Sequence, residues 1–76
     1  MSEDKTLDTV GLLCPLPVLK ARKALLSMQP GEVLRLLASD PAAIVDVPHF
    51  CAESGHELLE IEEAVEGTQA YLIRRA

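Results

Sequence analysis

The stretch GLLCPLPVLKAR, residues 11–22, marks the place where the apolar pattern of the chain changes from that of a strand to that of a helix. Before it, residues 5–10 alternate and include β-branched side chains, which predicts a short strand ending at Gly11. After it, apolar residues recur at spacings of three and four, which predicts an amphipathic helix over residues 15–28. The fold is therefore expected to begin with a strand that leads directly into a helix.

The following segment predicts a second strand. Pro30 and Gly31 end the first helix, because proline cannot continue it and glycine tolerates the positive φ of a helix-ending turn. Residues 32–39 (EVLRLLAS) are almost continuously apolar, as is typical of a central strand. Strand, helix and strand with short connections form a βαβ unit, whose crossover is expected to be right-handed.

A second helix is expected to run up to Gly55, and it contains a proline. Ser39 or Asp40 can cap its start. Because the residue before a proline avoids the helical region, Pro48 predicts a kink or two short helices, with Asp46 capping the second.

The last part of the chain predicts a hairpin. Residues 56–65 and 68–75 have the pattern of two strands joined around Gly67. The whole order is βαβαββ, an α/β (α+β) fold in which two helices cover one face of a mixed four-stranded sheet. Residues 1–5 are expected to be flexible, which leaves a single domain over residues 6–76.

Composition and charge exclude several classes of protein. A chain of 76 residues is expected to form one small domain, and only 3% of its residues are aromatic, which excludes a large aromatic-lined pocket. The net charge of -5 argues against strong direct binding of nucleic acid. The sequence has neither an apolar run that could span a membrane nor a secretory signal, so we expect a cytoplasmic protein with two reduced cysteines.

Cys14 is the candidate reactive residue, because it lies at the expected start of the first helix. With Cys14 as the N-cap, Pro15 and Pro17 occupy the first and third helical positions, where a missing N–H breaks no helical hydrogen bond. Leu16 is then expected to supply a backbone donor and an apolar contact beside the sulfur. Since thiols at helix N-termini titrate below their usual value, we expect a moderately lowered pKa for Cys14.

The motif also limits what this thiol can do. In dithiol redox motifs a second cysteine three positions on resolves a mixed disulfide, and here that position is Pro17. An adduct on Cys14 therefore has no neighbouring thiol to expel it, which favours holding a persulfide over cycling as an oxidoreductase. The structural alternative is that Cys14 is a small buried residue at an ordinary junction.

At these residues the sequence resembles the TusA/SirA-like sulfur carriers. The pattern of that family, an Asp, a Gly and then Cys-Pro-x-Pro, is matched at Asp8, Gly11, Cys14, Pro15 and Pro17. Further blocks match in the same order, namely MQPGE, DPAAIVDVPHFC, GHEL and YLIRR. The resemblance therefore covers essentially the whole chain from Thr6.

The resemblance implies a two-layer sandwich in which Cys14 accepts sulfane sulfur as a persulfide, with no cofactor. The implied donor is a cysteine desulfurase or a rhodanese-like protein, and the implied acceptor is a DsrE-like relay leading to 2-thiouridine in tRNA. The variable motif position is Leu16, where well-known tRNA-thiolation members have an acid. Sulfur oxidation and molybdenum-cofactor supply therefore stay open as pathways, and a non-catalytic regulatory interaction module is the alternative from another class.

Other candidate residues carry weaker signals. Cys51 is expected to be a packing residue. Together with His49 and His56 it matches no usual zinc spacing, so no metal site is expected. A basic cluster on the first helix is expected to be a solvated face or, as the functional alternative, a docking patch for an acidic surface of the sulfur donor or acceptor. This basic cluster consists of Lys20, Arg22 and Lys23.

Overall fold

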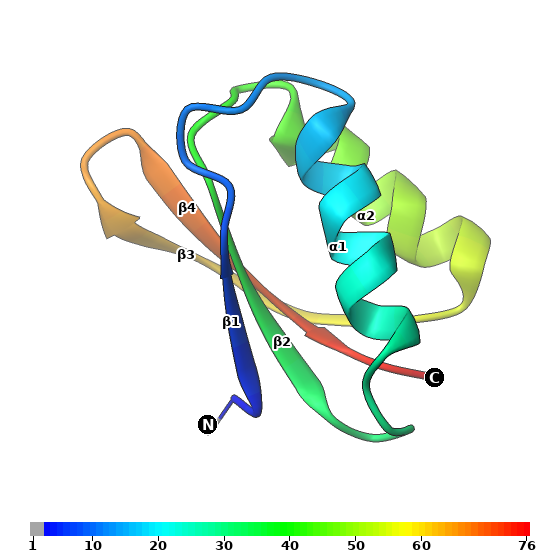
Figure 1. Ribbon diagram of the computed structural model, residues 1–76. Helices are drawn as coiled ribbons and strands as arrows, with labels where there is room; N and C mark the ends of the chain where they lie inside the picture. The colour runs from blue at the N-terminus through cyan, green and yellow to red at the C-terminus, as the bar shows by residue number, and fades with distance from the viewer. Residues whose placement is uncertain (1–2) are drawn as a thin grey trace.

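Four strands form one sheet, and both helices pack on the same face of it (Figure 1). The computed structural model describes residues 3–76. The elements are β1 (Lys5–Asp8), α1 (Leu16–Leu26), β2 (Val33–Ala38), α2 (Ala43–Ser54), β3 (Glu57–Val65) and β4 (Thr68–Arg74). This order confirms the predicted βαβαββ fold.

The sheet has the strand order β1-β2-β4-β3 and is mixed. β1 runs parallel to β2, with Leu7 opposite Leu36, and β4 is antiparallel to both of its neighbours, β2 and β3. The apolar segment β2 therefore occupies a central position, as its composition predicts.

The core lies between the sheet and the two helices. Leu36 of β2 and Tyr71 of β4 are opposite one another, and both are fully buried. Leu25 of α1 and Val47 of α2 belong to the same buried cluster. Small side chains at several of its positions let the helices approach the sheet closely. The other members are Ala21, Ala24, Met28, Leu34, Ala38, Ala43, Cys51 and Ile73.

Charged side chains cover the opposite face of the sheet. Arg35 lies 3.7 Å from Glu3 and 3.9 Å from Glu62 in ion pairs. Leu72 is opposite Arg35 on this face, yet it is only 5% exposed. Long charged side chains bury their apolar stems against such residues, so this face needs no third layer.

The helix α2 runs without interruption from Ala43 to Ser54, through Pro48. The predicted division into two short helices is therefore wrong, and Asp46 caps no second helix. Proline removes one helical hydrogen bond, but Val47 and Cys51, on either side of it, are buried in the core. Burial of these side chains outweighs the lost bond.

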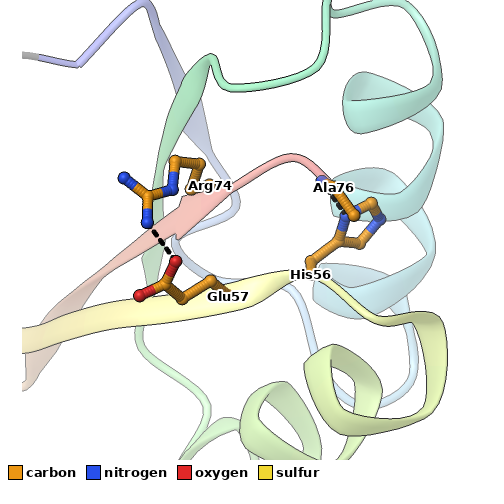
Figure 2. Close-up of polar contacts among 4 residues, drawn as sticks. All are labelled: His56, Glu57, Arg74 and Ala76. Atoms are coloured by element: carbon orange, nitrogen blue, oxygen red, sulfur yellow. Dashed lines mark hydrogen bonds and ion pairs between the residues drawn. The ribbon is translucent and has the colours of Figure 1, made fainter.

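Contacts at the end of the chain tie β4 to its neighbours. Figure 2 shows that the backbone N–H of Ala76 donates to Nδ1 of His56 at 3.0 Å and that Arg74 pairs with Glu57. Arg75 donates through Nε to a carbonyl oxygen in the last turn of α1 at 2.6 Å. The β3–β4 pair is thus fastened to α1 at this end.

Part of the segment 1–5, which is expected to be flexible, lies outside the described residues, namely residues 1 and 2. The backbone N–H of Asp4 donates to the Val33 carbonyl at 2.8 Å, and the Asp4 carboxylate accepts the Val33 N–H at 2.8 Å. Among residues 3–76, the helices are too short and too polar to cross a bilayer.

Candidate functional site

The site lies where both helices begin. Because β1 and β2 are parallel, their carboxyl ends are at the same edge of the sheet, and the connections to α1 and α2 leave from there (Figure 1). Cys14 lies in the first connection and Asp40 in the second. The backbone N–H of Cys14 donates to Oδ2 of Asp40 at 2.6 Å, so the two connections are joined at the candidate residue itself.

The connection that carries Cys14 is held by side chains on both sides. Oδ1 of Asp8 accepts the Val10 N–H at 2.9 Å. The N–H of Gly11 donates to Oγ of Ser39 at 2.9 Å, and Gly11 has a φ of 87°, a conformation that glycine adopts without strain. Thr9 is fully buried and donates through Oγ1 to the Leu37 carbonyl at 2.5 Å. The hydrogen bonds of Asp8 and Gly11 therefore help to hold the connection that carries Cys14.

The start of α1 differs from the sequence prediction by one residue. Pro15, not Cys14, is the N-cap, so Leu16 and Pro17 occupy the first two helical positions. The Leu16 N–H donates to the Leu13 carbonyl at 2.8 Å, and the Cys14 N–H is taken by Asp40. Both amides thus already donate to oxygen acceptors, so the Leu16 N–H is not the free donor for the thiolate that the sequence predicts.

The electrostatic surroundings of Cys14 are negative. A hydrogen bond to the Asp46 side chain, partial removal from water, and the negative charges of Asp46 and Asp40 raise the pKa of the Cys14 thiol above its ordinary value. The predicted lowering of this pKa is therefore wrong. The prediction took Cys14 as the N-cap of α1, but Pro15 occupies that position, and two carboxylates from the second connection and α2 act on the thiol instead.

Cys14 is exposed and opens into a shallow pocket of about 230 Å³ between the start of α1 and the length of α2 from Asp46 to Glu53. Apolar and acidic groups form its wall, and Nε2 of His49 lies 3.2 Å from Oε1 of Glu53 rather than at the sulfur. The lining residues are Cys14, Pro15, Val18, Asp46, His49, Phe50 and Glu53. Leu16 is not among them and is 44% exposed.

Asp40 and Asp46 belong to the site, although the sequence predicts them only as possible helix caps. The predicted right-handed βαβ crossover indicates where these acids lie, because it places the start of the second helix beside that of the first. The Asp46, Phe50 and Glu53 spacing of four and three then puts these side chains on one face of α2.

The basic cluster does not surround the thiol. Lys20 and Lys23 line a second open hollow of about 270 Å³, between α1 and β1, together with Lys5. Arg22 is exposed on α1. None of the three is among the residues that line the pocket at Cys14.

The second cysteine is a core residue. Cys51 is 3% exposed, and burial raises the pKa of its thiol to about 11. It lies in the cluster between α2 and the sheet, as a packing residue does. Within residues 3–76 no group of three or more His, Cys, Asp or Glu side chains is placed to hold a metal ion.

Comparison with known proteins agrees with this architecture. The sequence matches the family described as Sulfurtransferase TusA over residues 5–75. The crystal structure of a SirA-like protein from Desulfitobacterium hafniense superposes with a TM-score of 0.82 at 27% sequence identity, covering 92% of this chain and 95% of that one. The resemblance carried by the Cys-Pro-x-Pro motif is thereby confirmed, and the chain belongs to the TusA family of sulfurtransferases.

Proposed function

We propose that Cys14 carries sulfane sulfur as a persulfide between two partner proteins. The observation that supports this most directly is the contrast between the two thiols. Cys14 is exposed at the mouth of an open pocket, whereas Cys51 is 3% exposed in the core. One thiol is accessible to a partner, and the position three residues after it is Pro17, so it has no resolving neighbour.

The proposed reaction is an exchange without net oxidation. The Cys14 thiolate attacks the outer sulfur of a donor persulfide, the donor S–S bond breaks, and the donor thiolate leaves and takes up a proton. The product is Cys14 persulfide. In the second transfer an acceptor thiolate attacks the outer sulfur and Cys14 becomes the leaving group. This exchange requires no cofactor, and we propose none.

The proposed donor is a cysteine desulfurase or a rhodanese-like protein, and the proposed acceptor is a DsrE-like relay protein on the path to tRNA 2-thiouridine. The carrier itself is not proposed to bind tRNA strongly, because its net charge is -5. With Leu16 at the variable motif position, sulfur oxidation and molybdenum-cofactor supply are the alternative pathways.

The test is incubation with a cysteine desulfurase and radiolabelled cysteine. We expect label on the wild-type protein, release of the label by dithiothreitol, and no label on Cys14→Ser. A Cys51→Ala variant serves as the matched control and is expected to load like the wild type. Loading of Cys14→Ser would contradict the assignment of the thiol.

A second candidate, a non-catalytic interaction module, is favoured by the surface beside Cys14. Leu13 is 67% exposed and Val10 is 50% exposed on the connection that carries the thiol. Such side chains fit a binding surface even without chemistry at the sulfur. Binding of a partner without any label on the wild-type protein would support this candidate instead.

A further inference from the structure

The hollow between α1 and β1 is a surface that the proposed sulfur chemistry does not use. It measures about 270 Å³, and its lining combines cations with apolar groups. Two elements, the edge strand β1 and the helix α1 with its C-cap, supply this lining (Figure 1). We call it the basic hollow, and its lining residues are Lys5, Leu7, Lys20, Lys23, Ala24 and Ser27.

The three lysines of the basic hollow are not neutralised within the chain. All three are exposed, and within residues 3–76 none of them forms an ion pair. The acids at the two ends of β1 are engaged elsewhere, since the carboxylates of Asp4 and Asp8 each accept a backbone N–H outside the hollow. No acid is among the lining residues. The hollow therefore carries positive charge that only a group from outside the chain can neutralise.

This arrangement does not stabilise the free protein. Lys20 and Lys23 are three positions apart on α1, so their side chains are neighbours on the helix surface and repel one another. Lys5 adds a third like charge from β1. The Ser27 hydroxyl donates to the Ala24 carbonyl at 2.8 Å, so the lysines are the donors that remain for a ligand. A cluster of repelling cations in one hollow is better explained by recognition of an anion than by stability of the fold.

The floor of the basic hollow indicates the class of anion. Ala24 is only 7% exposed, and Leu7 is half-buried against the core. An inorganic anion would pair with the lysines but leave this apolar floor in water, whereas a protein segment can bring carboxylates and an apolar side chain together. Nucleic acid is disfavoured, because the net charge of the whole chain is -5.

We propose that the basic hollow docks an acidic segment of a partner protein. Carboxylates of this segment pair with the three lysines, and an apolar side chain between them covers Leu7 and Ala24. The pairs orient the segment on α1 and β1 more than they add affinity, because exposed ion pairs are individually weak.

The docked segment leaves the thiol free. Lys20 and Lys23 are four and seven positions after Leu16, which places them about 6 and 10 Å along the helix axis from the first residue of α1. The basic hollow and the pocket at Cys14 share no lining residue. A partner can therefore stay bound through the hollow while Cys14 remains accessible.

The first experiment titrates the ¹⁵N-labelled protein with a blocked peptide that repeats Glu-Glu-Leu, and it follows the backbone amides by NMR at low salt. We expect the largest shifts over residues 5–8 and 20–27. A peptide with Gln in place of every Glu is the matched control and is expected to cause no shifts. Binding of the acidic peptide should weaken severalfold at about 0.5 M salt, because exposed charges are screened.

The second experiment compares variants at about 0.15 M salt. We expect the double variant Lys5→Glu and Lys23→Glu to bind the acidic peptide about tenfold more weakly than the wild type, since two attractions become repulsions. Arg22→Glu makes an equal change of charge per residue on the same helix but outside the hollow, and it is expected to bind within about twofold of the wild type. Urea unfolding should show that the double variant is at least as stable as the wild type.

Three results would overturn the proposal. The first is the absence of shifts over residues 5–8 and 20–27, or an equal loss of binding in Arg22→Glu. The second is tighter binding of a single-stranded oligonucleotide at the same amides, which would replace the partner protein by nucleic acid. The third is the same shifts on concentrating the protein alone, which would assign the hollow to a second copy of the chain. None of these readouts involves Cys14, so they do not depend on the proposed sulfur transfer.

Discussion

Asp40 links three parts of the site through one carboxylate. Oδ2 accepts the N–H of Cys14 at 2.6 Å, and Oδ1 accepts the N–H of Ala42 at 3.1 Å, so the same residue places the thiol and begins the approach to α2. Both bonds are made by a side chain that is only 9% exposed. The carboxylate therefore satisfies two backbone donors through part-buried hydrogen bonds.

Asp40→Asn is expected to lower the free energy of unfolding by about 1–3 kcal/mol. The amide group has one acceptor oxygen, so one of the two backbone donors loses its partner. Urea unfolding of the variant and the wild type measures the difference. Equal stability would show that the connections are held without this carboxylate.

Tyr71 presents the opposite case, a buried polar group without a partner. Its hydroxyl has no hydrogen-bond partner among the described residues, although the side chain is fully buried. Tyr71→Phe removes the unsatisfied group and keeps the ring. We expect it to raise the free energy of unfolding by about 1 kcal/mol. A clear loss of stability in urea unfolding would mean that the hydroxyl is bonded in solution.

His56 gives the protein a dependence on acid. Burial and the positive charge of Arg75 lower the pKa of His56 below its ordinary value of 6.5, and its Nδ1 accepts the Ala76 N–H (Figure 2). The fold therefore prefers the neutral imidazole. This contribution to stability is present above about pH 6.5 and is lost as the pH falls through the lowered pKa.

We expect His56→Asn to lose less stability than the wild type between about pH 7.5 and pH 5. Asparagine offers an acceptor but does not titrate. The difference should stay below about 1 kcal/mol, because the group is only partly buried. Urea unfolding at several pH values measures it, and parallel pH curves for the two proteins would contradict the assignment.

At the scale of the elements, α2 shows how tertiary packing overrides a local rule. The rule that proline interrupts a helix considers one backbone hydrogen bond. It cannot include the burial of Val47 and Cys51 against the sheet, because these contacts join segments far apart in the sequence. The boundaries of α1 and of the hairpin strands were predictable to within a few residues, since they depend on periodicity and on glycine and proline nearby.

Pro48→Ala is expected to stabilise α2. It restores a backbone donor within the helix, and the helical penalty of proline is about 3 kcal/mol. The greater freedom of the unfolded chain opposes this by about 1 kcal/mol at most. We therefore expect a net gain of about 1–2 kcal/mol in urea unfolding. No gain would mean that packing of the proline ring supplies an equal amount.

The identity of the reactive residue could be predicted from the sequence, but its electrostatics could not. Cys14 and the absence of a resolving thiol follow from a local motif. The acids that set its pKa are distant in the chain, as Asp40 is separated from Cys14 by 26 positions. Only the parallel pairing of β1 and β2 brings them together. The thiol thus has surroundings opposite in sign to those that its own helix predicts.

At the scale of the whole molecule, charge is divided between two sides. Acidic groups line the pocket at Cys14, whereas Lys5, Lys20 and Lys23 line the hollow between α1 and β1. A partner that spans both would present a cation to the first and acids to the second. This pattern fixes the orientation in which a partner docks more than it adds affinity.

We expect the double variant Lys20→Glu and Lys23→Glu to load persulfide more slowly from a cysteine desulfurase and to lose most of the salt dependence of loading. Alkylation of Cys14 by iodoacetamide serves as the control and is expected to change little, because the lysines do not line its pocket. Loading at the wild-type rate would remove this basic cluster from the docking surface.

The position of β3 has a consequence for the behaviour of the protein in concentrated solution. β3 is an edge strand, and its exposed backbone could in principle pair with a second molecule. Four of its nine residues are glutamates, so two such edges brought together repel one another. The same residues that make the chain acidic thus protect it from aggregation, and that protection lasts only while the carboxylates are ionised.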